Sequence, residues 1–318
     1  MTSKGPLFRL LLASDLHGSN AAFRKLVALT LQLKVDALVV AGDWSGKQSL
    51  LVSKRPDGSA LYLDFDGTER SLPVERTKAQ LEEWRDTGIY PVLVDEINER
   101  TKENVDSLAQ ETRALRLKQW LDYGQTKTAR AGVRIPLFAI PGNDDGPEID
   151  GALINHPWVC DLDQRVVLHD QYELLGFGYS NLTPWHTPRE LSEPQIAARL
   201  ESLGRNIDHW SNTIAVIHVP PFGSGLDLAP EVIADDQQPP KETGRGNIPV
   251  GSHAVRSFIE NHGPLAVLSG HCHGSRGLVR IGLTTCVNAG SQYHHGNLCA
   301  CLMSFRNEEM IGHQFFVH

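Results

Sequence analysis

Five short apolar runs recur along the chain, and each one is followed directly by polar residues, glycine or histidine. The runs are Leu7–Ala13, Asp36–Ala41, Leu137–Ile140, Thr213–Ile217 and Leu265–Ser269. Uninterrupted apolar runs of this length are typical of strands that are buried on both faces. The pattern therefore predicts five core strands whose ends carry the polar chemistry of the molecule.

Between the first two runs, apolar residues recur at helical spacing, which predicts a helix over Ser19–Gln32, capped by Ser19 or Asn20. Strand, helix and strand in this order form a βαβ unit. Four later runs have no helical segment between them and are expected to be antiparallel strands: Gly277–Ile281, Thr284–Asn288, Leu298–Phe305 and Met310–Val317. This mixture predicts an α/β sandwich with more than one sheet.

The segment from about 45 to 134 does not follow this pattern of apolar runs and polar ends. The turn sequence Arg55–Gly58 lies between strand-like residues and predicts a hairpin. Val94–Ala131 is long, charged and free of proline, which predicts one or two amphipathic helices. We expect a single domain over residues 1–318 with a largely helical insertion, either a cap or dimer element or a solvated decoration. Gly223–Gly251, rich in proline, glycine and aspartate, is expected to be a long loop near the site.

Composition narrows the class of protein. The chain has 318 residues, of which 41% are hydrophobic, and a formal net charge of -8. An acidic chain gives little reason to expect nucleic acid or an anionic membrane as a partner. The first apolar run is too short for a signal sequence or a membrane span. Five irregularly spaced cysteines favour free, buried thiols, so we expect a cytoplasmic location.

The side chains that follow the apolar runs are carboxylates, imidazoles and an amide. They are Asp15, His17, Asp43, Asn143, His218, His271 and His273. Ligands in open α/β sheets gather at the carboxyl ends of strands, so these residues are expected to meet at one edge of the sheets. Imidazole and oxygen donors without a thiolate suit manganese, iron, zinc or cobalt better than an all-oxygen calcium cage.

Each motif alone is a weak signal, but the ordered set resembles the calcineurin-like metallophosphoesterases. The chain carries Asp15-Leu16-His17, Gly42-Asp43, Gly142-Asn143-Asp144-Asp145, His218 and Gly270-His271-Cys272-His273, and the resemblance extends over about residues 8 to 305. It implies a four-layer α/β/β/α sandwich of two mixed sheets. It also implies a metal-dependent phosphoric ester hydrolase.

Carried across residue by residue, the resemblance implies two adjacent divalent metal ions. The first would be held by Asp15, His17, Asp43 and His273, and the second by Asp43, Asn143, His218 and His271. Asp43 would bridge the two ions, because one carboxylate has two oxygens. Manganese or iron is favoured, and zinc, nickel or cobalt also fits the ligands. Such a pair, about 3.5–4 Å apart, clamps a phosphoryl group and shares an attacking hydroxide, which makes Asp43 and His218 catalytic candidates.

The chain departs from the family pattern at Asp144, where relatives carry a histidine that neutralises the phosphate and protonates the leaving group. An ionised Asp144 would repel the substrate, and it is a catalytic candidate only as a proton donor with a raised pKa, which nearby cations oppose. Asp145 is expected to orient a ligand histidine.

Several further residues are candidates beside the site. Substitutes for the missing histidine are His186, His294 and His295, and Arg276 and His295 are candidate substrate-binding residues. Asn288–Ser291 is either a turn beside the site or a plain turn.

Three functions remain open. The leading hypothesis is hydrolysis of a small phosphate ester, with diesters favoured over monoesters. The reasons are the missing histidine after Asn143 and the lack of an arginine cluster that would bind the dianion of a monoester. The alternative is a catalytically weak metal-binding scaffold or interaction protein of the same fold, favoured by Asp144 and opposed by the full ligand set. A nuclease is the third, opposed by the acidic charge. The oligomeric state is open, and a dimer through the insertion is one option.

Overall fold

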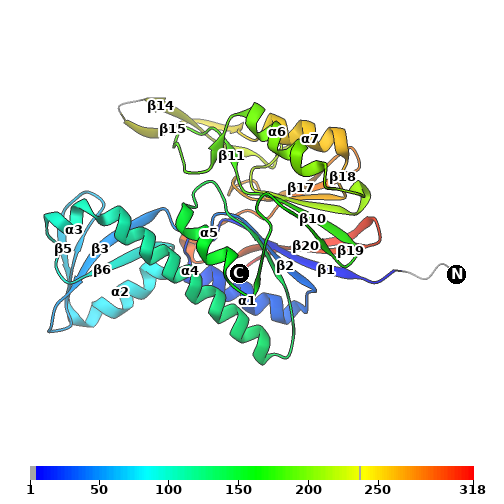
Figure 1. The fold of residues 1–318 in the computed structure, drawn as a ribbon. Helices are drawn as coiled ribbons and strands as arrows, with labels where there is room; N and C mark the ends of the chain where they lie inside the picture. The colour runs from blue at the N-terminus through cyan, green and yellow to red at the C-terminus, as the bar shows by residue number, and fades with distance from the viewer. Residues whose placement is uncertain (1–4, 236–237) are drawn as a thin grey trace.

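Two six-stranded mixed sheets lie face to face with helices outside them (Figure 1). The computed structural model describes residues 5–235 and 238–318. The strand order is β20-β19-β1-β2-β7-β8 in the first sheet and β17-β18-β16-β13-β10-β9 in the second. This arrangement confirms the four-layer α/β/β/α sandwich.

The elements of the sandwich agree closely with the five apolar runs and the later antiparallel pairs. The first sheet contains β1 (Phe8–Ala13), β2 (Ala37–Ala41), β7 (Leu137–Ile140), β8 (Val159–Asp161), β19 (Cys299–Arg306) and β20 (Glu309–Val317). The second contains β9 (Val166–His169), β10 (Tyr172–Phe177), β13 (Thr213–Ile217), β16 (Ala266–Ser269), β17 (Gly277–Ile281) and β18 (Thr284–Asn288). The helices outside them are α1 (Asn20–Leu33), α5 (Pro147–Ile154), α6 (Glu193–Gly204) and α7 (His253–His262), and β11 (Ser180–Asn181) pairs with β12 (Glu190–Leu191).

Successive side chains of each strand point into two different cores, which explains why the strand sequences are apolar throughout. Leu11 of β1 packs in the core beneath α1, whereas Leu10 and Leu12 pack in the core between the sheets. A third core fills the space between the second sheet and the helices α6 and α7. Successive side chains point to opposite faces, so a strand covered on both faces needs apolar residues at every position.

The five motif-bearing strands all end at the same edge of the sandwich. In the first sheet β2 pairs in parallel with β1 on one side and with β7 on the other, and in the second sheet β13 and β16 are parallel neighbours. Parallel neighbours place their carboxyl ends together, which brings the five polar motifs into one region. Ser19 accepts a hydrogen bond from the Ala22 N–H and caps α1, as the sequence predicts.

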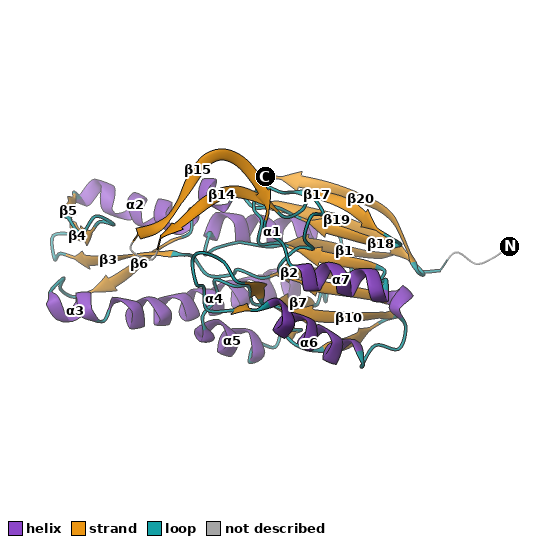
Figure 2. Ribbon diagram, turned by 90° about the horizontal axis from the view of Figure 1, so that it is seen from above, coloured by secondary structure: helices purple, strands orange, loops and turns teal. Residues whose placement is uncertain are grey.

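The insertion between β2 and β7 is a small three-layer unit rather than a set of helices alone. It comprises β3 (Gln48–Lys54), β4 (Ala60–Leu63), β5 (Glu69–Leu72), α2 (Val74–Asp86), β6 (Ile89–Val94), α3 (Glu99–Glu103) and α4 (Val105–Arg130). Figure 2 shows α2 on one face of the sheet and α3 and α4 on the other. The predicted hairpin and late helices are present, but the sequence analysis missed β5, α2 and β6. Pro91 hides β6, because proline weakens a strand signal and is tolerated only at an edge.

Helix α4 fastens the insertion to the sandwich. Ala109 near its start packs against Leu51 and Val92 of the insertion sheet. Farther along, Trp120 and Leu121 enter the core beneath the first sheet. One continuous helix therefore belongs to both cores, so the insertion is held in a fixed position by packing.

The stretch 223–251 is not the long loop that the sequence predicts. It forms an antiparallel ribbon of β14 (Leu228–Asp235) and β15 (Gln238–Pro249), which projects from the top of the molecule in Figure 1. Each strand of a two-stranded ribbon keeps one unpaired edge, where proline is tolerated. The pairing of the two strands is irregular at two places, where the register shifts between Pro230 and Val232 and between Ile233 and Asp235.

The cysteines are free thiols, as predicted, with Cys160 half-buried and the other four buried. Among the described helices, none is both long enough and apolar enough to cross a bilayer.

We predict that Trp120→Ala destabilises the protein by about 3–5 kcal/mol, the range for truncating a large buried aromatic. The Trp120 ring stacks on Phe23 with a centroid distance of 4.7 Å, and its indole N–H donates to Asn20 Oδ1 at 2.7 Å. Urea unfolding measures the change. Leu115→Ala on the same helix, whose side chain is 58% exposed, is the control and should stay within about 0.5 kcal/mol. Equal effects would contradict the role of α4.

Candidate metal centre

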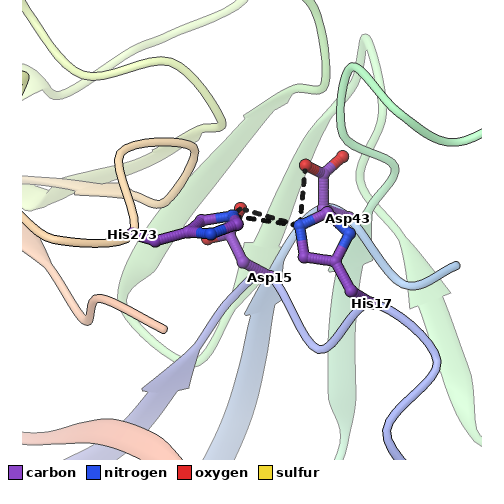
Figure 3. A group of neighbouring side chains, drawn as sticks. All are labelled: Asp15, His17, Asp43 and His273. Carbon is purple, nitrogen blue, oxygen red and sulfur yellow. Dashed lines mark hydrogen bonds and ion pairs between the residues drawn. The ribbon is translucent and has the colours of Figure 1, made fainter. Parts of the chain in front are cut away.

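Four candidate ligands converge at the carboxyl edge of the sheets. The ligand atoms of Asp15, His17, Asp43 and His273 all lie within 4.8 Å of one another. His17 Nε2 and His273 Nε2 are 3.0 Å apart, and His273 Nε2 is 3.5 Å from Asp15 Oδ1 (Figure 3). Atoms that share a cation at about 2.1 Å stand roughly 3 Å apart, so this group has suitable spacing for one ion.

A second group of donors lies beside the first. His218 Nε2 is 2.9 Å from Asn143 Oδ1, and His271 Nδ1 is 2.7 Å from the same oxygen. The side chain of Asn143 is therefore placed between the two imidazoles. The group again has imidazole and oxygen donors at the spacing of ligands around a single cation.

Asp43 joins the two groups through one oxygen. Its Oδ2 lies 3.5 Å from His17 Nε2 in the first group and 3.4 Å from His218 Nε2 in the second. Its Oδ1 accepts a hydrogen bond from the Asp144 N–H at 2.9 Å. The sequence analysis assigned one oxygen to each ion, whereas in the structure the Oδ2 atom alone faces both groups.

Backbone strain concentrates at these ligands. Four of them have positive φ angles: Asp15 at 54°, His17 at 40°, Asp43 at 54° and His271 at 65°. Residues with a side chain rarely adopt this conformation, and it persists where the surrounding structure holds it. The loops after β1, β2 and β16 are thus held in conformations that turn their ligands toward a common point.

The glycines of the motifs are required by close packing. A Cβ at Gly142 would overlap the Asp43 carboxylate, and one at Gly270 would overlap Ser14 and Asp15. A Cβ at Gly42 would meet His218 Nδ1 at 2.5 Å, and its φ of 101° favours glycine independently. These glycines let neighbouring loops approach until their ligands share a site.

Hydrogen bonds orient the imidazoles. His218 Nδ1 donates to the Ala41 carbonyl at 2.7 Å, and His17 Nδ1 donates to the Ser45 carbonyl at 3.2 Å. This arrangement leaves Nε2 of each ring free to face Asp43, as in sites where an outer partner fixes the tautomer of a ligand histidine.

Asn288 fixes the loop that carries His271 and His273. Its buried amide donates to the Gly270 and Cys272 carbonyls at 3.1 and 3.0 Å, and Ser291 Oγ donates to the Asp15 carbonyl at 2.7 Å. The turn Asn288–Ser291 is therefore a support of the site rather than a plain turn.

Asp145 ties the loop after β2 to the loop after β7, and it does not orient a histidine as the sequence predicted. Its carboxylate accepts hydrogen bonds from the N–H groups of Trp44, Ser45 and Gly142 at 3.1, 2.9 and 2.9 Å. It also accepts one from Ser45 Oγ at 2.8 Å. One buried side chain thus fixes the distance between Asp43 and Asn143.

Comparison with known proteins agrees with this geometry. The sequence profile of the calcineurin-like phosphoesterases matches residues 8–275, a span that includes every candidate ligand. The chain belongs to this family. An uncharacterized protein of Methanocaldococcus jannaschii is 30% identical over 164 residues, which cover 51% of this chain and 67% of that protein.

Solved structures show the same fold at low identity. A protein of Thermus thermophilus aligns over 98% of this chain and 99% of its own, with a TM-score of 0.52 and 14% identity. Another crystal structure aligns over the same shares with a TM-score of 0.55 and 16% identity. At these identities the likeness concerns the fold alone.

The donors of the two groups fit divalent cations. Burial raises the pKa of Asp43 to about 7, against the attraction of His218, and Asp144 raises it further. Burial alone would lower the pKa of His218, but the Asp43 carboxylate outweighs it and raises the value to about 9. A divalent cation would reverse both shifts, because it stabilises the ionised carboxylate and the neutral imidazole. Burial also lowers the pKa of His271 to about 3, which keeps that ring neutral and available as a ligand.

Asp144 is an ion-pair partner in this structure, and its surroundings do not favour a protonated carboxyl group. Its Oδ2 lies 2.6 Å from Lys47 Nζ, at the start of the insertion. Burial would raise the pKa of Asp144, but the Lys47 and His17 charges lower it to about 2. The carboxyl group is therefore ionised at neutral pH, which corrects its candidate role as the acid. The sequence analysis missed Lys47, because no motif marks it.

Of the two predicted substrate-binding residues, Arg276 contacts a side chain of β20, whereas the role of His295 stays a prediction. The Arg276 guanidinium lies over the Phe315 ring at 6.0 Å, on the side of β20. His295 is exposed, and its ring lies against that of His294 at a tilt of 52°, with the ring centroids 4.0 Å apart. Tyr293 contacts the ligands instead, with its ring 4.5 Å from that of His17 and 5.8 Å from that of His273.

His186, a further candidate substitute for the missing histidine, is exposed and has a φ of 50°. Its neighbour Thr187 accepts a hydrogen bond from Asn143 Nδ2 at 2.9 Å. The loop that carries His186 therefore contacts the second group through Thr187.

We predict that Gly142→Ala lowers the affinity for Mn²⁺ about 10- to 100-fold, as losses of outer support do at other metal sites. The added methyl group would displace the Asp43 carboxylate. Titration calorimetry on chelator-treated protein measures the affinity. Gly151→Ala, where no atom lies within 4 Å of the added Cβ, is the matched control and should bind Mn²⁺ as the parent does. Unchanged affinity in Gly142→Ala would contradict the assignment.

Proposed function

We propose that this protein hydrolyses phosphate esters, with diesters preferred over monoesters, and that it does so with two divalent cations. The observation that carries the proposal is the position of Asp43 Oδ2, 3.5 Å from His17 Nε2 and 3.4 Å from His218 Nε2. Membership of the calcineurin-like phosphoesterase family supports the same chemistry.

Asp15, His17, Asp43 and His273 would hold one ion, and Asp43, Asn143, His218 and His271 the other. Manganese or iron suits these donors best, and zinc, nickel or cobalt is also compatible. Bound divalent cations supply neutralising charge for the phosphoryl oxygens and lower the pKa of an attacking water.

The side chains of the chain itself provide orientation and charge. His17 and His218 present Nε2 because Nδ1 is occupied by a backbone carbonyl, so neither ring has to rotate during the reaction. Lys47 places an ammonium group beside the cluster, close enough for its charge to act on His17 and His271. A phosphoryl oxygen at the cluster would be attracted by that charge.

The charge beside the cluster favours a monoanionic substrate. Lys47 and Asp144 form a pair with no net charge, so the pair offers no surplus positive charge to a dianion. A phosphodiester carries one negative charge and a monoester carries up to two at neutral pH, and the ionised Asp144 repels the second more strongly. We therefore propose a small phosphodiester as the substrate and, from the net charge of -8, expect no nucleic acid partner.

We propose the insertion as one wall of the substrate site. The Cβ of an alanine at Gly88, in the turn between α2 and β6, would meet the Tyr293 ring at 2.9 Å and would also overlap the His17 carbonyl. The Lys47 side chain is supplied by the first residues of the same insertion. The insertion thus reaches the ligands from the side of His17.

The alternative of a metal-binding scaffold rests on one observation, the carboxylate of Asp144 where a catalytic histidine is expected. A scaffold would bind cations without turning over esters. The two functions therefore differ in turnover and agree in metal binding.

To separate them, the protein is stripped with chelator and supplied with Mn²⁺, Fe²⁺, Zn²⁺, Ni²⁺ or Mg²⁺ before assay on bis-aryl and mono-aryl phosphates. We expect metal-dependent turnover that is faster on the diester and falls at least about 1,000-fold in Asp43→Asn and His218→Ala, since a misplaced ligand removes both charge and nucleophile. His313→Ala on β20, an exposed histidine, is the control. Metal binding without turnover on any ester would favour the scaffold instead.

We predict that Lys47→Ala raises KM for the bis-aryl phosphate roughly fivefold, a modest effect because the side chain is 46% exposed. Removal of the ammonium also leaves the Asp144 charge unpaired, which adds repulsion. Lys47→Arg should restore most of the affinity, and Lys54→Ala, an exposed lysine on β3, should leave KM unchanged. A fall in kcat with unchanged KM in Lys47→Ala would contradict a substrate-binding role.

A further inference from the structure

A cavity of about 710 Å³ lies where the insertion meets the sandwich, apart from the candidate metal ligands. Residues of α1, α2, β6 and α4 line it, and β6 is an edge strand of the insertion sheet. Cavities of 300–1,000 Å³ are of the size that binds small organic ligands. Neither the metal centre nor the proposed hydrolysis makes use of this space.

Three arginines and two carboxylates, Glu82 and Asp86, line the cavity, and two of the arginines have no carboxylate in ion-pair contact. Arg24 pairs with Asp86 at 3.8 Å, whereas no described carboxylate forms an ion pair with Arg85 or Arg116. Arg116 is only 7% exposed and lies over the Tyr90 ring at 4.3 Å. A buried guanidinium that no carboxylate contacts directly is costly, so the part of the cavity beside Arg85 and Arg116 favours an anion.

The lining of the cavity also contains apolar side chains that face solvent. Leu93 and Leu115 line the cavity with 49% and 58% of their surfaces exposed, and Pro91 is a further apolar lining residue. Apolar side chains beside unpaired arginines match a ligand with an anionic end and an apolar body. The two guanidinium groups of Arg85 and Arg116 carry more N–H donors than the two oxygens of a carboxylate accept, which favours the three oxygens of a phosphoryl group.

We propose that this cavity binds a small organic phosphate. Its phosphoryl group lies between Arg85 and Arg116, and its apolar part packs on Leu93 and Leu115. The site is separate from the metal centre, so it does not depend on the proposed hydrolysis.

Binding there acts on the loop that carries His17. Arg116 Nη1 lies 3.5 Å from the Gly18 carbonyl, and Ser19 Oγ donates to the Asp86 carbonyl at 2.5 Å. A ligand that bridges α2 and α4 therefore fixes the insertion against this loop. The expected consequence is a higher melting temperature of the ligand-bound protein.

The test is titration calorimetry of the chelator-treated full chain with phenyl phosphate, with inorganic phosphate and benzoate as comparison probes. Chelator treatment removes the cations that would hold a phosphoryl group at the metal centre, and the variants below assign the remaining heat of binding to the cavity. We expect saturable binding near one per chain, with phenyl phosphate tighter than either comparison probe. No binding of phenyl phosphate, or equal affinity for benzoate, would overturn the proposal.

Variants locate the binding. Arg85→Ala should weaken phenyl phosphate binding about tenfold, as loss of a charged hydrogen bond does. Leu115→Glu places a carboxylate on the cavity wall at an exposed position that folding tolerates, and it should abolish binding. Lys118→Ala, an exposed lysine of α4 outside the cavity, should bind as the parent does. Equal binding of phenyl phosphate by all three variants would contradict a binding site in this cavity, whether or not the protein hydrolyses esters.

Discussion

The structure depends on the burial of several carboxylates in one place. Asp15, Asp43 and Asp145 are 0%, 1% and 0% exposed, and they lie close together at the edge of the sandwich. Asp145 is satisfied by backbone N–H groups, and Asp144 by Lys47. Asp43 faces two imidazoles through a single oxygen. Buried charge of one sign requires compensation, and divalent cations between these donors supply it.

The rest of the structure holds these carboxylates and the histidines beside them in place. Glycines let the loops after β2, β7 and β16 approach one another, and strained backbone at four ligands is held by the sheets beneath. Asp145 and Asn288 fix the distances between loops. The insertion adds Lys47 on one side and, through α4, is packed into the same core as the ligand-bearing strands. Rigid support of this kind preorganises a site for charge stabilisation.

The core strands and the candidate ligands were predictable from the sequence, because each polar motif directly follows a buried apolar strand. An apolar run followed by Asp or His marks a buried strand whose end meets others, so β1, β2, β7, β13 and β16 and their seven polar followers were placed correctly together. What failed depends on side-chain direction or on distant partners. Arg276 lies toward Phe315, and Lys47 gains its role only through Asp144, about a hundred residues away. Prolines concealed β6 and the ribbon β14–β15, since proline signals a turn unless a free strand edge accommodates it.

The most direct measurement is anomalous diffraction from crystals of the Mn²⁺-loaded protein. The account predicts two manganese peaks about 3.5–4 Å apart, one on each side of Asp43 Oδ2. His17 and His273 should coordinate one ion, and Asn143, His218 and His271 the other. A single peak within the Asp15, His17 and His273 group, or no peak near Asp43, would contradict the central claim that this carboxylate joins two cation sites.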